Sequence, residues 1–229
     1  MPTNLFTVRQ NKIYFSGLLI FLFAGLFYLL INGKAAAFIS LNSYHPFFLN
    51  VFFINYTFVG DGIFALCLTA LVLLYYKKRK QGLALLYAFL LSGLVVQIIK
   101  NLVDAPRPKL FFEAGQYLHF INDVSLANNS SFPSGHTATA FAIATVMVMM
   151  MKDKSWQSLI LIAAVLVGYS RIYLAQHFLL DVMIGAVIGS TSGILAVYLA
   201  VNGKLIKRSI KKMHRLQSPA AAPSPIQTV

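Results

Sequence analysis

A histidine and an aspartate one helical turn apart could together perform catalysis. His177 precedes Asp181 by four residues, so the carboxylate can accept a hydrogen bond from one ring nitrogen and leave the other free as a nucleophile. Ser170 and Arg171 lie shortly before this pair. Because histidine and aspartate at this spacing also serve purely structural roles, the pair does not define a site by itself.

A second cluster, Pro133-Ser134-Gly135-His136, comes directly before the apolar run 137–151. The start of a helix offers free backbone N–H groups and the positive end of the helix dipole, and glycine lets an oxyanion approach the backbone closely. The segment therefore predicts an anion-binding helix start with a histidine beside it. The alternative is a plain capping turn with Ser134 as the N-cap.

A third cluster consists of Lys100 and, after six residues, Arg107-Pro108. Basic residues at a helix end can also be interfacial anchors, and Lys100 could pair with Asp104. Taken together, however, the clusters supply three cations, an anion-binding helix start, two histidines and one carboxylate. Such a set suits phosphoryl transfer, in which catalysis is mostly positioning and neutralisation of charge. It lacks the carboxylates of a magnesium site, so we expect no metal and no cofactor.

The composition predicts that these residues are carried by a membrane protein. The 229 residues are 58% hydrophobic and 11% charged, whereas soluble domains are roughly a quarter charged. A membrane-spanning helix needs about 20 mainly apolar residues. We therefore predict an all-α polytopic membrane protein with six helices in one bundle, formed by residues 1–203. The apolar runs are 13–31, 57–76, 82–103, 136–151, 156–174 and 178–201.

The basic residues predict how this bundle is oriented. Of the 19 Lys and Arg residues, 14 fall at one end of the six predicted spans and five at the other. Because basic residues collect on the cytoplasmic side, both termini are predicted to be cytoplasmic and all three clusters to face the periplasm or exterior. Topology thus accounts for the net charge of +13 without a nucleic-acid partner. Residues 204–229 are predicted to form a basic interfacial segment and a disordered cytoplasmic tail.

The three clusters resemble the signature of the type 2 phosphatidic acid phosphatase family. That signature is Lys-x6-Arg-Pro, Pro-Ser-Gly-His and Ser-Arg-x5-His-x3-Asp, and all of its fixed positions occur here between residues 100 and 181. The resemblance implies that His177 forms a phosphohistidine and that Asp181 orients it. It implies that His136 protonates the leaving oxygen and helps to activate water. The phosphate ligands that it implies are Lys100, Arg107, Ser134, Gly135 and Arg171.

The expected activity is metal-independent removal of phosphate from membrane lipid phosphates or pyrophosphates. The candidate substrates are undecaprenyl pyrophosphate and phosphatidylglycerol phosphate, ahead of phosphatidate and lipid A phosphates, in a bacterial inner membrane. A lipid phosphotransferase would carry the same residues, because an acceptor hydroxyl can replace water. A transporter is disfavoured because the clusters lie at one membrane edge and no inverted pair of broken helices is evident. Vanadium haloperoxidases share the pocket, but six spans argue against them. The sequence leaves the oligomeric state open.

Other polar and aromatic residues near the outer face receive weaker predictions. Asp61, between Gly60 and Gly62, could contact the site, but we favour a turn or helix-start role. Aromatic residues in the loop 104–135 could guide a lipid tail or simply collect at the membrane interface, as aromatic side chains do. They are Phe111, Phe112, Tyr117, His119 and Phe120.

Overall fold

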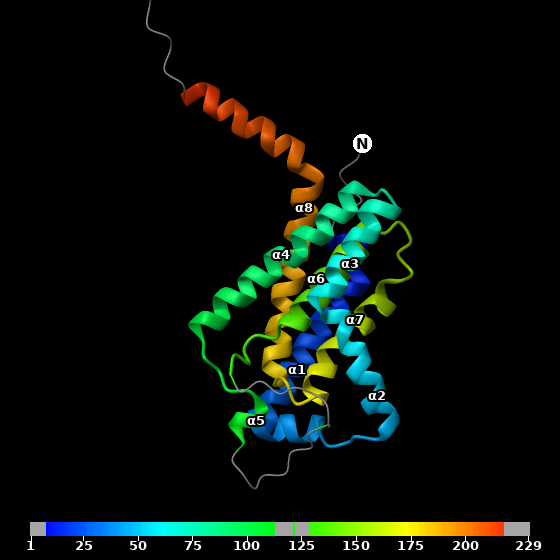
Figure 1. The fold of residues 1–229 in the computed structure, drawn as a ribbon, viewed down its shortest axis with the longest axis vertical. Helices are drawn as coiled ribbons and strands as arrows, with labels where there is room; N and C mark the ends of the chain where they lie inside the picture. Colours follow the sequence, from blue (N-terminus) through cyan, green and yellow to red (C-terminus); the bar gives the residue numbers. More distant parts are fainter. Residues whose placement is uncertain (1–7, 113–120, 122–128, 218–229) are drawn as a thin grey trace, which may run out of the picture.

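In a computed structural model, all regular structure of the described residues is helical (Figure 1). The described residues are 8–112, 121 and 129–217, with the backbone alone for 204–217. The main helices are α1 (Lys12–Leu41), α2 (Phe47–Tyr56), α3 (Gly62–Ala70), α4 (Arg79–Leu102), α6 (Gly135–Met150), α7 (Gln157–Tyr173) and α8 (Leu179–Gln217). The shorter ones are η2 (Val8–Asn11), η3 (Thr57–Gly60), η4 (Leu71–Tyr75) and α5 (Pro108–Phe111).

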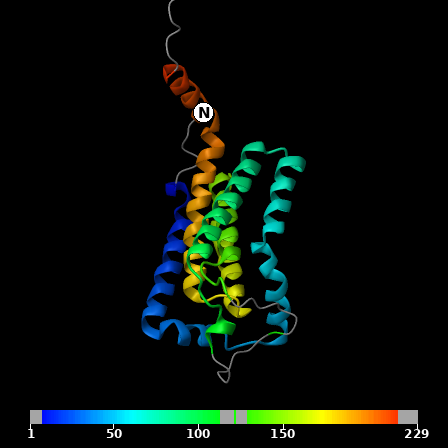
Figure 2. The ribbon, with the colours of Figure 1, turned by 60° about the vertical axis from the view of Figure 1, so that its left-hand side comes forward.

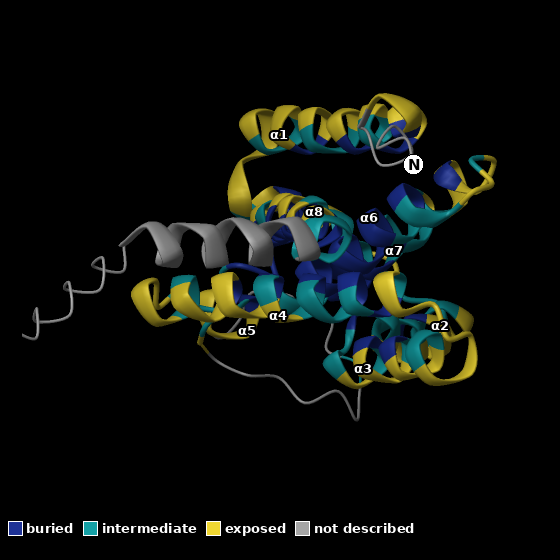
Figure 3. Ribbon diagram, turned by 90° about the horizontal axis from the view of Figure 1, so that it is seen from above, coloured by how far each residue is buried: buried dark blue, intermediate teal, exposed yellow. Residues whose placement is uncertain are grey.

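Helix α6 is the central element of the bundle. Twelve of its sixteen residues are buried, which is possible only if protein surrounds it on nearly every side. It packs against α4, α7 and α8 and against η3, while α1, α2 and α3 lie further out. Seen along the bundle, α6 is largely buried and the outer helices carry the exposed faces (Figure 3). Its first two residues, Gly135 and His136, are partly exposed at the end of this otherwise largely buried helix.

The close packing of α6 against α8 depends on glycines of α8. A Cβ atom at Gly185 would come within 2.6 Å of the carbonyl oxygen of Ser134, and one at Gly189 within 2.2 Å of that of Ala138. Neither distance is sterically allowed, so only glycine permits this separation of the two backbones. The one-turn spacing of these glycines thus brings the first turn of α8 to the start of α6.

The segment predicted as one span over 57–76 is a bent pair of helices. Phe47–Gly60 and Gly62–Tyr75 meet at 59°, and Asp61 between them has an extended backbone (ψ 151°). The prediction of a single helix starting at residue 57 was wrong because flanking glycines and an aspartate cap allow the chain to leave and re-enter the helix. The second half of the pair then runs alongside α4.

Among the described residues, three helices are long and apolar enough to cross a bilayer by themselves. They are Arg9–Leu41, Arg79–Leu102 and Leu179–Gly203, and the bent pair gives a fourth candidate if it counts as one span. Helices α6 and α7 are apolar but have only 16 and 17 residues. The architecture is that of an all-α protein with three to four candidate spans. That the chain crosses the membrane six times stays a prediction.

The two ends of the bundle differ in what they carry. The start of α1 and the far part of α8 lie at one end, and α5 lies at the other (Figures 1 and 2). The backbone of residues 204–217 continues α8 beyond the bundle, so the predicted interfacial segment begins as part of that helix. Residues 218–229, the rest of the predicted tail, lie outside the described residues.

Candidate active site

The three clusters meet at the end of the bundle that carries α5. Lys100 belongs to the last turn of α4, Arg107 precedes α5, and Arg171 lies in the last turn of α7. Lys100 lies within Coulombic range of both arginines and of Asp181. The backbone N–H of Ser134 donates to the carbonyl oxygen of Asp181 at 3.0 Å, which joins the second cluster to the third. Residues that are far apart in the sequence therefore share one site.

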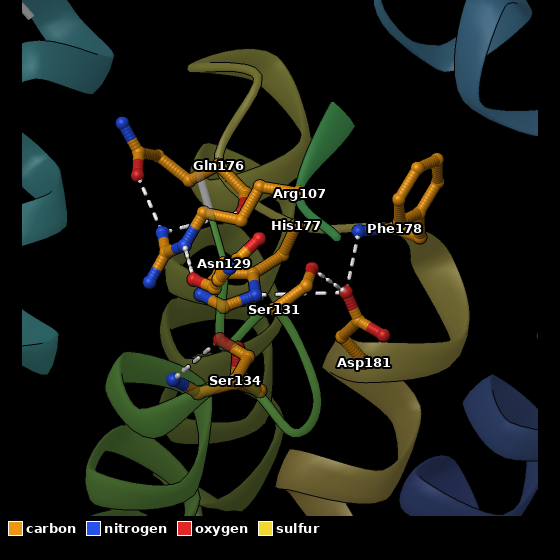
Figure 4. A network of polar contacts seen from close by, with 9 residues as sticks. Arg107, Asn129, Ser131, Ser134, Gln176, His177, Phe178 and Asp181 are labelled. Atoms are coloured by element: carbon orange, nitrogen blue, oxygen red, sulfur yellow. Dashed lines mark hydrogen bonds and ion pairs between the residues drawn. The ribbon is translucent and has the colours of Figure 1, made fainter. Parts of the chain in front are cut away.

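His177 and Asp181 face each other in the buried part of the site (Figure 4). His177 Nδ1 lies 3.6 Å from Asp181 Oδ2, and only 2% of the histidine side chain is exposed. At this distance Nδ1 has no hydrogen-bond partner, so the ring and the carboxylate face each other without a direct hydrogen bond. Because Nδ1 faces the carboxylate, Nε2 on the opposite side of the ring is free to attack a phosphorus atom.

The Asp181 carboxylate is fixed by two donors that the sequence does not reveal as a group. Ser131 Oγ donates to Oδ2 at 2.6 Å, and the backbone N–H of Phe178 donates to the same oxygen at 2.9 Å. Hydrogen bonds to an ionised carboxylate are among the stronger ones in proteins. The carboxylate is therefore oriented before any substrate binds.

Burial governs the protonation of His177, which lies in the turn between α7 and α8. Removal from solvent lowers the pKa of His177 below its usual value near 6.5, and nearby Arg171 and Arg107 act in the same direction. The Asp181 carboxylate opposes this shift without cancelling it. The ring is therefore neutral at physiological pH, as a nucleophile must be.

The start of α6 is capped and also accessible. Ser134 Oγ accepts from Thr137 Oγ1 at 2.9 Å and from the Thr137 backbone N–H at 3.4 Å, so the capping role is real. At Gly135 the nearest atom to an added Cβ would be a methyl of Val96 at 3.8 Å, which leaves the backbone approachable. His136 has a side chain that is 32% exposed, unlike buried His177.

The two arginines are held by different partners. Arg107 donates from Nε to the carbonyl oxygen of Asn129 at 3.0 Å and from Nη1 to Gln176 Oε1 at 2.6 Å. Arg171 is 8% exposed and donates from Nη1 to Thr57 Oγ1 at 2.6 Å. Its Nε is buried without a protein acceptor, which leaves a donor for an anionic ligand.

Several features outside the three clusters correct or complete the sequence-based predictions. Within the described residues, Lys100 makes no ion pair with Asp104. Phe112 is buried against Phe38, with ring centroids 5.6 Å apart, so it is a packing residue, whereas Phe111 is 39% exposed. The predicted loop residues Tyr117, His119 and Phe120 lie outside the described residues.

Asp61 is both a helix cap and a neighbour of the site. Its Oδ1 accepts from the backbone N–H of Ile63 at 2.8 Å, as the predicted helix-start role requires. Its Oδ2 lies 3.7 Å from His136 Nε2. In the sequence, only the Gly-Asp-Gly triplet at 60–62 pointed to Asp61 as a residue of interest. Ser131 and Thr57 gave no signal, because their contacts depend on how the helices pack.

The site offers cations rather than metal ligands. In the part of the chain that the structure describes, no three side chains of histidine, cysteine, aspartate or glutamate converge as a metal site would require. Lys100, Arg107 and Arg171 provide positive charge in its place, next to an anion-binding helix start. The arrangement can bind a phosphate group and present it to the Nε2 atom of a neutral histidine.

Comparison with known proteins agrees with this chemistry. Residues 81–204 match the family described as the PAP2 superfamily. The chain is 31% identical to an undecaprenyl-diphosphatase of Sulfolobus acidocaldarius over 61% of its own length and 65% of that relative. It is 29% identical to phosphatidylglycerophosphatase B of Bacillus subtilis, over 62% of this chain and 70% of the relative. The match thus spans just under two thirds of the first of these proteins.

Two solved structures have the same arrangement of helices. The crystal structure of Aquifex aeolicus LpxE matches with a TM-score of 0.63 and 31% identity, over 72% of this chain and 94% of that one. A transmembrane PAP2-type phosphatidylglycerolphosphate phosphatase from Bacillus subtilis matches with a TM-score of 0.60 and 26% identity, over 82% and 94%. The likeness includes both sequence and fold.

Proposed function

The chain belongs to the PAP2 superfamily, and from this we propose that it releases phosphate from membrane lipid phosphates or pyrophosphates through a phosphohistidine. The observation that carries the proposal is the buried pair of His177 and Asp181, which lies beside three cations and the partly exposed His136. A family of lipid phosphatases and a site with this chemistry point to the same reaction. The chain is accordingly a lipid-phosphate hydrolase embedded in a membrane.

In the first step, His177 Nε2 attacks phosphorus. A P–N bond forms, the bond from phosphorus to the lipid oxygen breaks, and its electron pair goes to that oxygen, which takes a proton from His136. Lys100, Arg107 and Arg171 stabilise the charge on the phosphoryl oxygens. The N–H groups of Gly135 and its neighbours complete the anion site, with Ser134 beside them.

In the second step, water replaces the lipid. Neutral His136 takes a proton from a water molecule, whose oxygen attacks the phosphorus of the phosphohistidine. The P–N bond breaks, its electron pair returns to His177, and inorganic phosphate leaves. Asp181 holds the ring of His177 in the attacking orientation throughout and stabilises the positive charge that the ring acquires.

The proposal includes the placement of the protein in the membrane. Residues 1–203 form the phosphatase domain with six crossings, both termini are cytoplasmic, and the site faces the periplasm or exterior. The shared end of the bundle at which α1 starts and α8 leaves supports an even number of crossings (Figure 2). The excess of basic residues predicted at that end supports its cytoplasmic location. Residues 204–229 form a separate basic segment and tail.

The proposed substrates are lipids of the outer leaflet with a terminal phosphate. Undecaprenyl pyrophosphate and phosphatidylglycerol phosphate rank first, because proteins similar to this chain are named for these two activities. Phosphatidate and lipid A phosphates rank second. In each case the site would bind the phosphate, and the lipid chain would lie against the apolar surface of the bundle.

The test is phosphate release by the full chain in detergent with excess chelator, across these four lipid classes. We expect release that survives chelation and is lost in His177→Ala. Rapid quenching at alkaline pH, where phosphohistidine is stable, should trap labelled phosphate on the wild type and none on His177→Ala. Asp153→Asn, an exposed carboxylate in the turn between α6 and α7, is the matched control and should keep full activity.

Two results would contradict the proposal. Absence of labelled protein during turnover would exclude the covalent step. Transfer of label to a lipid or sugar hydroxyl, with no free phosphate, would identify a phosphotransferase that uses the same histidine.

A further inference from the structure

The break in the second helix pair touches the active site at two places. Thr57, at the start of η3, accepts a hydrogen bond from Arg171 at 2.6 Å. Asp61, at the end of the break, places Oδ2 3.7 Å from His136 Nε2. No residue of this segment belongs to the three sequence clusters. The break therefore contacts Arg171, a proposed phosphate-binding residue, and His136, the proposed acid. This placement suggests a role in the site beyond bending the helix.

We propose that Asp61 is a positioning residue that keeps His136 protonated and correctly oriented for its role as the acid. This inference rests on the proposed function, because it assigns a partner to the proton donor of that reaction. Each histidine would then have its own carboxylate. Asp181 orients the neutral nucleophile His177, and Asp61 stabilises the protonated form of the acid His136.

The position of the Asp61 carboxylate is fixed by the backbone. Its Oδ1 accepts from the N–H of Ile63 at 2.8 Å and so caps α3. With one oxygen held in this way, the other stays near His136 without the entropic cost of ordering a free side chain. The cap and the ion pair use different oxygens, so a single aspartate can do both.

The backbone beside Asp61 packs directly on His136. A Cβ at Gly60 would lie 2.7 Å from the carbonyl oxygen of His136 and 3.0 Å from its Cβ. Only glycine allows η3 to come this close to the first turn of α6. The distance between the Asp61 carboxylate and the imidazole is therefore set by packing of the main chain rather than by a flexible contact.

The charges around His136 explain why it needs a carboxylate. Arg171 from α7, Arg107 before α5, Lys100 from α4 and His177 before α8 all lie within Coulombic range of the ring. The three cations Lys100, Arg107 and Arg171 oppose a proton on His136, yet an acid must carry one. The nearby carboxylates are Asp61 and Asp181, and Asp181 is already bound by Ser131 and Phe178. Among the described residues, Asp61 is thus the carboxylate that pairs with His136, and it also lies within Coulombic range of Arg171.

The proton transfer balances with this assignment. Protonated His136 carries hydrogen on both ring nitrogens, and Nε2 faces Asp61. The lipid oxygen receives the electron pair of the breaking P–O bond together with the proton from Nδ1. His136 is then neutral, with Nε2–H still facing the carboxylate, and Nδ1 can take a proton from the attacking water. Asp61 exchanges no proton at any stage.

The experiment compares two leaving groups. Asp61→Asn keeps the size and the capping ability of the side chain and removes its charge. We expect kcat for a lipid alkyl phosphate, whose leaving oxygen needs a proton, to fall by on the order of 10- to 100-fold. The rate with p-nitrophenyl phosphate, whose leaving group departs without a proton, should fall several-fold less. A merely structural role would lower both rates equally.

Further variants separate the cap from the pair. Asp61→Ala removes both and should lose thermal stability in addition to activity, whereas Asp61→Glu retains a carboxylate and should recover part of the alkyl phosphate rate. In a His136→Ala background, Asp61→Asn should have little further effect, because the residue acts through His136. Asp153→Asn is again the matched control.

Equal losses with both substrates, or wild-type rates in Asp61→Asn, would overturn the inference while leaving the proposed function intact. Failure of the proposed function looks different, because the wild-type chain itself would then release no phosphate and trap no label.

Discussion

The N–H of Ser134 and the carbonyl oxygen of Asp181 form a hydrogen bond of 3.0 Å between two helix starts. Three residues earlier, Ser131 donates through its side chain to the Asp181 carboxylate. The segment 131–134 therefore contacts the first turn of α8 twice, once through the backbone and once through a side chain. These contacts hold the start of α6 in register with Asp181, the carboxylate that faces His177.

Ser131→Ala should weaken catalysis by loosening Asp181. The variant removes one of two donors to Oδ2, and a hydrogen bond to a charged group contributes about 1.5–3 kcal/mol. We expect kcat to fall on the order of 10-fold, with little change in KM. The control is Ser92→Ala, because Ser92 is also buried but donates to the carbonyl of Phe89 in its own helix. Equal effects of the two variants would contradict the role of Ser131.

Thr57→Val should weaken the binding of phosphate by Arg171. Valine has nearly the same shape as threonine but cannot accept the bond from Arg171 Nη1, so the guanidinium loses its anchor. We expect the inhibition constant of inorganic phosphate to rise by on the order of 10-fold, as steady-state inhibition can measure. Thr57→Ser retains the hydroxyl and should behave like the wild type. An unchanged inhibition constant in Thr57→Val would rule out this anchoring role.

Gly189→Ala should destabilise the bundle. The added methyl would collide with the backbone of Ala138 in α6, and such overpacking typically costs about 1–3 kcal/mol. Each kcal/mol lowers the thermal midpoint of a chain of this size by about 2–4 °C. The control is Gly93→Ala, where nothing lies within 4 Å and the gain in helix propensity should stabilise α4 slightly. Thermal unfolding in detergent measures both, and equal midpoints would disprove the close packing.

The pH profile should show an active enzyme well below pH 6.5. Since burial lowers the pKa of His177, the nucleophile stays neutral as pH falls through the usual histidine range, and kcat/KM declines only at more acidic pH. The unfolded chain binds this proton more readily than the folded one. Stability is therefore complete above about pH 6.5 and decreases as pH falls below it. An acid limb of kcat/KM centred near pH 6.5, the usual pKa of histidine, would contradict the lowered pKa of His177.

The sequence predicted the parts of the site that have fixed spacing. The His177–Asp181 interval, the glycine before His136 and the small residues along α8 are local patterns, and the structure places them together as expected. The all-helical fold followed from apolar runs of suitable length. Sequence reasoning also identified the family, because the signature lies within a few short segments.

The residues that were missed contact the site through tertiary packing. Thr57 and Ser131 are ordinary hydroxyl residues in sequence, and their roles appear only when a bent helix pair and a loop reach Arg171 and Asp181. The bend itself was missed because the run 57–76 is apolar enough for one helix. Asp61 has the extended backbone that interrupts it. The periodicity of apolar residues indicates which face of a helix is buried. It does not indicate where a helix is interrupted so that a residue such as Asp61 can contact a site.

The burial of α6 has a consequence for how the protein responds to its bilayer. A helix that contacts lipid must match the hydrocarbon thickness or tilt, and membranes of different thickness distort it accordingly. Helix α6, with twelve of its sixteen residues buried in protein, is largely spared that requirement. Thinning or thickening of the membrane would act on α1, α4 and the bent pair, while the helix that presents His136 stays clamped between α7 and α8. The position of His136 should thereby depend less on lipid composition than the positions of Lys100 on α4 and of Thr57 and Asp61 on the bent pair.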